Sequence, residues 1–217
     1  EAENLFKNLY IAIKYVSGKD SDNCAQILNY LWTAQTHLEK YAEAETNITE
    51  MCRTRELQKI SKDSTYRDWL YETVLYYKNN KKLENIETPL LKILKIQAEI
   101  TGEDNANYLA YKRTLGDLYR AIKRYAEAEK IFTQNIEQLK KQYPNQPNIY
   151  TQDLIALGAI YENKQAYTKA ENIYKDAIKQ YKSNKDTTEK FANLIESLIE
   201  IYQPQNKNLE AVQYAQD

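Results

Sequence analysis

The sequence predicts an all-α fold, an α-solenoid built from repeated antiparallel helix hairpins. Three observations predict it: a helix-favouring composition, a repeat of about 42 residues, and two amphipathic stretches in each repeat. The 217 residues include only four glycines and four prolines, too few for a fold with many tight turns between strands. Lys, Glu, Gln, Ala, Leu and Ile dominate the composition, and all except Ile are strong helix formers.

The repeat becomes visible when the chain is aligned with itself. The pentapeptide Tyr-Ala-Glu-Ala-Glu at residues 41–45 recurs at 125–129, which is 84 positions or two periods of 42 later. Such a period is typical of arrays of helix hairpins. One position followed at this interval is always apolar: Ala2, Ala44, Ile86, Ala128, Ala170 and Val212. A second apolar column consists of Phe6, Ile48, Leu90, Phe132 and Tyr174.

Each period contains two helical stretches. Residues 107–120 are the first predicted helical stretch of one copy, and its apolar side chains recur every three or four positions. Residues 125–139 show the same spacing and are predicted as the second helix. Polar loops with turn or N-cap residues separate the periods, at residues 17–22, 101–105, 143–147 and 183–187.

Two glycines lie inside predicted first helices, Gly116 and Gly158, 42 positions apart. Glycine in a helix interior costs about 1 kcal/mol relative to alanine. We therefore expect a neighbouring helix to approach closely at both positions, with Ala128 and Ala170 as the facing residues.

These positions carry a resemblance to a known family. Leu115-Gly116-x-x-Tyr119, followed by Ala128 and Phe132, resembles the tetratricopeptide repeat, as does the copy that starts at residue 157. The copies near residues 31 and 73 are less regular, and the last, near 198–202, fits with a deletion of one residue. The period of 42 and the Gly-Glu-Asp segment at 102–104 are similar to the variety found in kinesin light chains and many bacterial repeat proteins.

The sequence departs from the family at the turn inside each hairpin. Where the family usually has glycine, this chain has Glu39, Lys81, Lys123 and Gln165. The conformation of these turns is therefore an open question at the level of the sequence.

The resemblance implies a right-handed superhelix whose first helices line a concave groove that binds extended peptides or short helices of partner proteins. Candidate groove residues carried over from the family lie on four successive first helices. They are Gln26, Asn29, Tyr30, Thr33 and His37; Asp68, Tyr71, Glu72, Leu75 and Lys78; Arg113, Thr114, Asp117 and Arg120; and Gln152, Ile155, Ala156, Ala159 and Glu162.

The charged candidates have two interpretations. Arg113 and Asp117 are four residues apart and can pair along the helix. Alternatively, Arg113 and Arg120 grip a carboxylate or a carbonyl of the partner. The Lys/Asn arrangement of chaperone-type carboxylate clamps is absent, so binding of an acidic C-terminal tail is not predicted. Tyr30 and Tyr71 are candidate exposed aromatics, although most of the 20 tyrosines fall at packing positions.

Composition and motifs argue against other classes of function. The formal net charge of −1 argues against nucleic acid, which requires a basic face. No apolar stretch approaches the roughly 20 residues of a membrane span. His37 is the single histidine and has no evident catalytic or metal-binding partners, and no glycine-rich phosphate-binding motif occurs. We therefore expect neither an enzyme nor a cofactor or metal site.

The two cysteines, Cys24 and Cys52, fall on the two helices of one predicted hairpin. They are expected to be buried thiols, with a disulfide as the alternative.

Together these features predict one repeat domain over residues 1–217, with about five repeats and both ends inside a repeat. The leading function is a non-enzymatic protein–protein interaction scaffold that binds a peptide or helix in its groove. The alternative is a regulatory or sensor segment of a larger enzyme or transcription regulator. A further possibility is self-association through uncapped terminal helices.

Overall fold

The computed structural model describes residues 1–57, 64–183 and 189–216, and over these residues it is helical without strands. The α-helices are α1 (Ala2–Ser17), α2 (Asp22–His37), α3 (Tyr41–Leu57), α4 (Ser64–Asn79), α5 (Glu87–Thr101), α6 (Ala106–Ala121), α7 (Tyr125–Gln142), α8 (Thr151–Asn163), α9 (Tyr167–Ser183), α10 (Glu189–Tyr202) and α11 (Asn208–Gln216). Short 3-10 helices span Leu83–Asn85, Pro147–Tyr150 and Gln203–Gln205.

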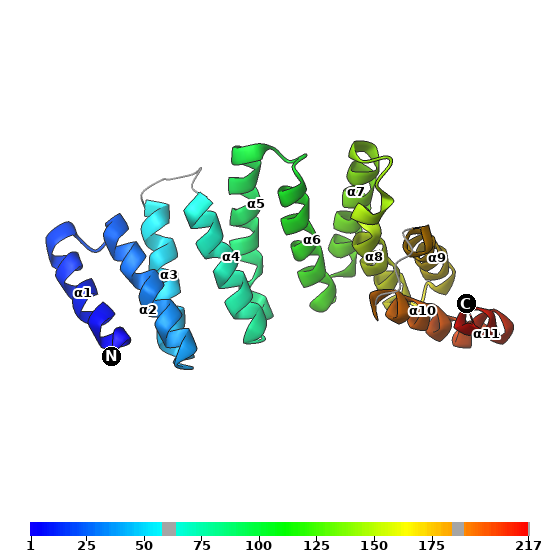
Figure 1. The fold of residues 1–217 in the computed structure, drawn as a ribbon, viewed down its shortest axis with the longest axis horizontal. Helices are drawn as coiled ribbons and strands as arrows, with labels where there is room; N and C mark the ends of the chain where they lie inside the picture. The colour runs from blue at the N-terminus through cyan, green and yellow to red at the C-terminus, as the bar shows by residue number, and fades with distance from the viewer. Residues whose placement is uncertain (58–63, 184–188, 217) are drawn as a thin grey trace. The chain divides into compact units, whose positions relative to one another are not determined.

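The helices fall into two compact units, Glu1–Tyr108 and Leu109–Asp217. In the first unit α2 packs on α3 and α4 on α5, and in the second α8 packs on α9 and α10 on α11 (Figure 1). The predicted all-α architecture of helix hairpins is confirmed. The predicted stretches at 107–120 and 125–139 correspond to α6 and α7. Of the predicted loops, the part at 184–187 lies outside the described residues.

The two apolar columns form the core of the hairpins. Ala44, Ala128 and Ala170 are fully buried, whereas the end members of that column, Ala2 and Val212, are exposed. The second column is buried at Ile48, Leu90, Phe132 and Tyr174, and Phe6 is half-buried. Small residues in one column and large residues in the other let the two helices of a hairpin approach and interdigitate.

The hairpin turns keep a left-handed residue although they lack glycine. Glu39, Lys81, Lys123 and Gln165 have φ values of 59°, 57°, 63° and 58°. Asn206 follows with φ of 57°, one position short of the 42-residue interval, where the sequence predicted a single deletion. The question that the missing glycines raised is therefore settled: the substituted residues adopt the left-handed conformation.

Two backbone hydrogen bonds close each of these turns in the Schellman pattern. After α2, Lys40 N–H donates to the Gln35 carbonyl at 2.8 Å, and Glu39 N–H donates to the Thr36 carbonyl at 3.1 Å. After α6 the corresponding donor is Arg124, whose N–H reaches the Tyr119 carbonyl at 2.7 Å. These bonds satisfy carbonyls at the helix end and reverse the chain over a few residues.

The glycines inside α6 and α8 face aromatic rings rather than alanines. A Cβ atom on Gly116 would lie 2.9 Å from Cζ of Phe132, and one on Gly158 would lie 2.3 Å from Cε1 of Tyr174. The expectation that Ala128 and Ala170 supply the close contact was therefore wrong. A large side chain one helical turn further along the second helix occupies the space that the missing Cβ leaves free.

Ion pairs join consecutive hairpins within each unit. Glu3, at the start of α1, accepts hydrogen bonds from Lys40 at 2.6 Å and from Gln35. The bonds from Lys40 and Lys7 lower the pKa of Glu3 to about 2, because they favour the charged form. Equivalent pairs join Glu45 to Lys82, Glu129 to Lys164 and Glu171 to Lys207.

Both cysteines are free thiols. Cys24 is buried and its Sγ lies 3.3 Å from the Gly18 carbonyl, which accepts its weak hydrogen bond. Cys52 is half-buried near Thr73, and burial raises the pKa of its thiol to about 11. The disulfide alternative is therefore not what the structure shows, and Cys52 stays protonated at neutral pH.

We predict that Lys123→Gly raises the free energy of unfolding by about 0.5–1 kcal/mol. Glycine removes the cost of the left-handed conformation, although its greater freedom in the unfolded chain offsets part of the gain. Urea denaturation measures the change. The matched control is Lys130→Gly at an exposed position inside α7, which should lower stability by about 1 kcal/mol. Equal losses in both variants would contradict the left-handed turn.

Gly158→Ala tests the contact with Tyr174 through the sign of its effect. Helix propensity alone predicts a gain of about 1 kcal/mol. The contact instead predicts a loss of about 1–3 kcal/mol, because a methyl group would overlap the ring. In a Tyr174→Leu background the loss should disappear, and a double-mutant cycle by thermal or chemical denaturation measures this coupling. A stabilising single substitution would show that the ring lies elsewhere.

Candidate functional site

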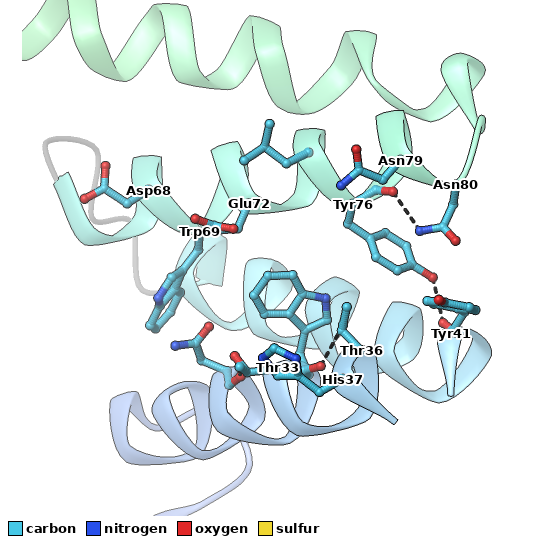
Figure 2. A pocket seen from close by; sticks show the side chains of 13 residues that line it. Thr33, Thr36, His37, Tyr41, Asp68, Trp69, Glu72, Tyr76, Asn79 and Asn80 are labelled. Atoms are coloured by element: carbon cyan, nitrogen blue, oxygen red, sulfur yellow. Dashed lines mark hydrogen bonds between the residues drawn. The ribbon is translucent and has the colours of Figure 1, made fainter. Parts of the chain in front are cut away.

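A hollow of about 650 Å³ lies in the first unit between α2 and α4. We call it the α2–α4 cavity. Its lining residues come from α2, from the start of α3, and from α4 and the turn after it (Figure 2). They are Asn29, Trp32, Thr33, Thr36, His37, Tyr41, Asp68, Trp69, Glu72, Leu75, Tyr76, Asn79 and Asn80. Six of them are predicted groove residues: Asn29, Thr33, His37, Asp68, Glu72 and Leu75.

Aromatic side chains form much of the cavity wall. Trp32 and Trp69 are 8% and 7% exposed, and Tyr76 is also buried. The Tyr76 hydroxyl donates to the Tyr41 carbonyl at 2.7 Å, and Asn80 Nδ2 donates to the Tyr76 carbonyl at 2.9 Å (Figure 2). These bonds fix the end of the cavity near the hairpin turns.

The hydroxyl groups on α2 are engaged with their own helix. Thr33 Oγ1 donates to the Asn29 carbonyl at 2.9 Å, and Thr36 Oγ1 donates to the Trp32 carbonyl at 2.8 Å. The Nε1–H group of Trp32 is different, since it is buried and has no hydrogen-bond acceptor within the described part of the chain. A buried donor without an acceptor is unusual and costs stability.

The charge of the cavity lining is negative. Asp68 and Glu72 contribute carboxylates, and none of the lining residues is a lysine or arginine. Asp68 is paired with its neighbour Arg67, whose Nη2 lies 2.6 Å from Oδ1. Glu72 is exposed and makes no ion pair or hydrogen bond with the residues that the structure describes.

Several predicted groove residues lie outside this cavity. The ring of Tyr30 stacks on Phe6 of α1 with centroids 5.4 Å apart, although Tyr30 remains 51% exposed. Gln26, Tyr71 and Lys78 are not among the lining residues. Whether these residues contact a partner stays a prediction.

In the second unit, Arg113 makes an ion pair that the sequence did not indicate. Its Nε and Nη2 donate to Oδ1 and Oδ2 of Asp153 at 3.1 and 2.5 Å, and Nη2 also donates to the Ile149 carbonyl. Asp117 pairs with Arg120 at 3.4 Å. The predicted pair between Arg113 and Asp117 was therefore wrong, because spacing along one helix cannot reveal a carboxylate on the next first helix.

Asp153 is fully buried at this pair. Burial raises the pKa of its carboxyl, while hydrogen bonds from Arg113 and Asn135 act in the opposite direction. Arg113 thus supports the packing of α6 against α8.

The remaining candidates on α6 and α8 also make contacts within the second unit. Thr114 Oγ1 donates to the Ala110 carbonyl, and Gln152 Nε2 donates to the Tyr181 hydroxyl. Glu162 accepts a hydrogen bond of 2.7 Å from the Tyr174 hydroxyl. Ala156 is buried, whereas Ile155 and Ala159 are half-buried.

Sequence reasoning missed most of the aromatic wall. Trp32 occupies the position of the repeat glycine, 84 residues before Gly116, where the family offers no groove residue. Tyr41 and Tyr76 fall at the start of one helix and near the end of another, where the repeat pattern assigns no groove residues. Their shared cavity follows from the packing of α2 beside α4, which no spacing within one helix reveals.

Exposed apolar side chains gather on α1 and α11. They are Leu5, Leu9, Ile11, Tyr15 and Val16 on α1, and Leu209 and Val212 on α11. Self-association through the terminal helices stays a prediction. In the described ranges, no helix combines the length and hydrophobicity that crossing a membrane demands. The same ranges contain no group of three or more His, Cys, Asp or Glu side chains suited to hold a metal ion.

A family model described as the tetratricopeptide repeat matches residues 114–147, which include the close contact between Gly116 and Phe132. The chain contains a tetratricopeptide repeat. A comparison with curated proteins found no significant match.

Several solved structures are similar to most of the chain, and some of them are described as having tetratricopeptide-type repeats. BtubC (BKLC) from P. vanneervenii is 13% identical with a TM-score of 0.67, covering 98% of this chain and 86% of that one. A putative kinesin light chain with nearly identical TPR-like repeats from Podosopora anserina is 15% identical with a TM-score of 0.68, covering 83% and 86%.

A third similar structure is a signal transduction ATPase with numerous domains from Pyrococcus horikoshii, which has a tetratricopeptide repeat sensor. It is 18% identical with a TM-score of 0.70, covering 98% of this chain and 33% of that chain. These similarities confirm the tetratricopeptide-type fold.

We predict that Arg113→Gln lowers the free energy of unfolding at pH 7 by about 3 kcal/mol, because it leaves the Asp153 carboxylate buried without its ion partner. The folded-state pKa of Asp153 lies above its ordinary value, so the charged form is the destabilised one. The loss should therefore shrink as the pH falls and Asp153 becomes protonated. Denaturation at pH 7 and pH 4 measures both effects.

Asp153→Asn in the Arg113→Gln background is the matched control and should recover part of the loss at pH 7. A loss that is equal at both pH values, without rescue, would contradict the role assigned to this pair.

Proposed function

We propose that the chain is a non-enzymatic scaffold and that the α2–α4 cavity binds a segment of a partner protein. The observation that carries this proposal is the cavity itself, which is lined by residues from two consecutive first helices. Its volume of about 650 Å³ is in the range of ligand pockets and accommodates several side chains of an extended peptide.

The chemistry of the lining suits a peptide. The indoles of Trp32 and Trp69 offer rigid apolar surface at a small cost in conformational entropy. The amides of Asn29 and Asn79 can donate to and accept from a peptide backbone. The Thr33 and Thr36 hydroxyls are already bonded to their helix and do not compete for those groups.

The composition of the same lining supports the non-enzymatic part of the proposal. It contains no serine or cysteine nucleophile, and His37 is the single histidine of the chain. The similar scaffold fold supports binding rather than catalysis, because repeat surfaces of this kind offer long faces for partners.

Selection of binders from a random 12-residue peptide library tests this proposal. Peptides selected on the 217-residue chain should bind it in solution, as measured by fluorescence anisotropy. Leu75→Arg inside the cavity should weaken that binding by at least about tenfold, because it places a long side chain in the binding space. Leu91→Arg, at an exposed leucine of α5 outside the cavity, should leave it unchanged. Binding that Leu75→Arg does not affect would contradict the cavity as the site.

A second candidate function is a regulatory or sensor segment of a larger protein. It is favoured by the similarity to a structure described as carrying a tetratricopeptide repeat sensor, of which this chain covers 33%. In that case the same cavity would recognise a partner segment whose binding is relayed to another domain. Mass spectrometry of the natural gene product, showing an attached catalytic or DNA-binding domain, would favour this candidate over a scaffold alone.

A further inference from the structure

We propose that the α2–α4 cavity selects partner segments by an arginine side chain, whose guanidinium pairs with Glu72 and stacks on the aromatic wall. This inference rests on the proposed function, since it names the chemistry of the segment that the scaffold binds. It is supported by the charge of the lining, by the confinement of that charge to one repeat, and by the aromatic groups beside it.

One of the two carboxylates of the cavity, that of Glu72, is available to a cationic group. Glu72 is exposed and unpaired within the described ranges. Arg67 donates both Nε and Nη2 to one oxygen of Asp68, Oδ1, at 3.0 and 2.6 Å. The lining itself holds no lysine or arginine. A cation from a partner would therefore meet the unpaired carboxylate of Glu72 and the second oxygen of Asp68, whose charge Arg67 already neutralises in part.

The negative charge is specific to this repeat. One and two periods after Asp68 the chain has Ala110 and Gln152, and the same steps after Glu72 reach Thr114 and Ala156. Packing of the repeat therefore does not require carboxylates at these positions. Their presence on α4 alone points to a role at the surface between α2 and α4.

The aromatic wall favours arginine over lysine. The guanidinium is planar and weakly hydrated, and it stacks on indoles while it bonds carboxylates. Within this chain such stacking is already present at Trp69, because the guanidinium carbon of Arg55 lies 4.9 Å from its ring centroid. One face of Trp69 is thus taken, and Trp32 is the second indole of the lining that a partner's arginine can stack on.

The Trp32 Nε1–H group supports a peptide as the carrier of the arginine. This buried donor has no acceptor in the described ranges. A guanidinium has only donors and cannot accept its hydrogen bond. A backbone carbonyl next to the arginine of a peptide can accept it. In Figure 2, Asp68 and Glu72 of α4 lie on the opposite side of the hollow from Thr33 and His37 of α2.

The chain contains its own reporters for this test, because its only two tryptophans both line the cavity. We would titrate the ¹⁵N-labelled 217-residue protein with the peptide acetyl-Gly-Ala-Arg-Ala-Gly-amide and follow both indole N–H resonances by NMR. Peptides with citrulline, lysine or glutamate in place of arginine serve as comparisons. Citrulline keeps the shape of arginine without its charge.

We expect saturable shifts of the indole resonances with the arginine peptide. The citrulline, lysine and glutamate peptides should bind at least about fivefold more weakly, because each lacks the charge or the planar cation. Glu72→Gln should weaken arginine binding by a similar factor. Glu137→Gln, which removes an exposed carboxylate of α7, should leave it unchanged.

Equal binding of the citrulline or lysine peptide, or arginine binding that survives Glu72→Gln, would overturn the inference. The peptide selection separates this failure from that of the proposed function. Selected peptides that are sensitive to Leu75→Arg but lack arginine would refute the arginine preference and leave the scaffold intact. Absence of any peptide that binds the cavity would refute both.

Discussion

The reversal of the chain after each first helix, over one left-handed residue, is the constraint on which the hairpins depend. Glu39, Lys81, Lys123 and Gln165 adopt it without the help of glycine. Two backbone bonds per turn satisfy helix-end carbonyls and offset the steric cost of the left-handed conformation. Because each turn is so short, the second helix begins beside the first and its small and large apolar columns face inward.

The same turns shape the candidate binding site. His37 and Tyr41 lie on either side of the turn at Glu39, and Asn79 and Asn80 precede the left-handed Lys81. The end of the α2–α4 cavity is thus built from residues whose positions the turns determine. The bond from the Tyr76 hydroxyl to the Tyr41 carbonyl joins the two turn regions. A site supported in this way is preorganised, which reduces the entropic cost of binding a flexible segment.

The first helices of the two units use polar residues differently. Between α2 and α4 the carboxylate of Glu72 stays exposed. Between α6 and α8, by contrast, Arg113 and the buried Asp153 form a pair that holds the helices together. First helices of the same repeat pattern therefore leave a carboxylate exposed in one unit and bury a paired one in the other. Because the repeats differ in this way, one pair of first helices can recognise a partner that the other pair does not.

Sequence alone determined the helices, the period of 42 residues, the hairpin pairing and the buried columns, because these follow from apolar periodicity and local propensity. Tertiary structure decided the rest. It placed Phe132 and Tyr174, rather than alanines, against the helix glycines, and it paired Arg113 with Asp153. It also gathered the tryptophans around one cavity. These contacts join side chains on different helices, and their geometry depends on how the helices pack, which a pattern along the chain does not specify.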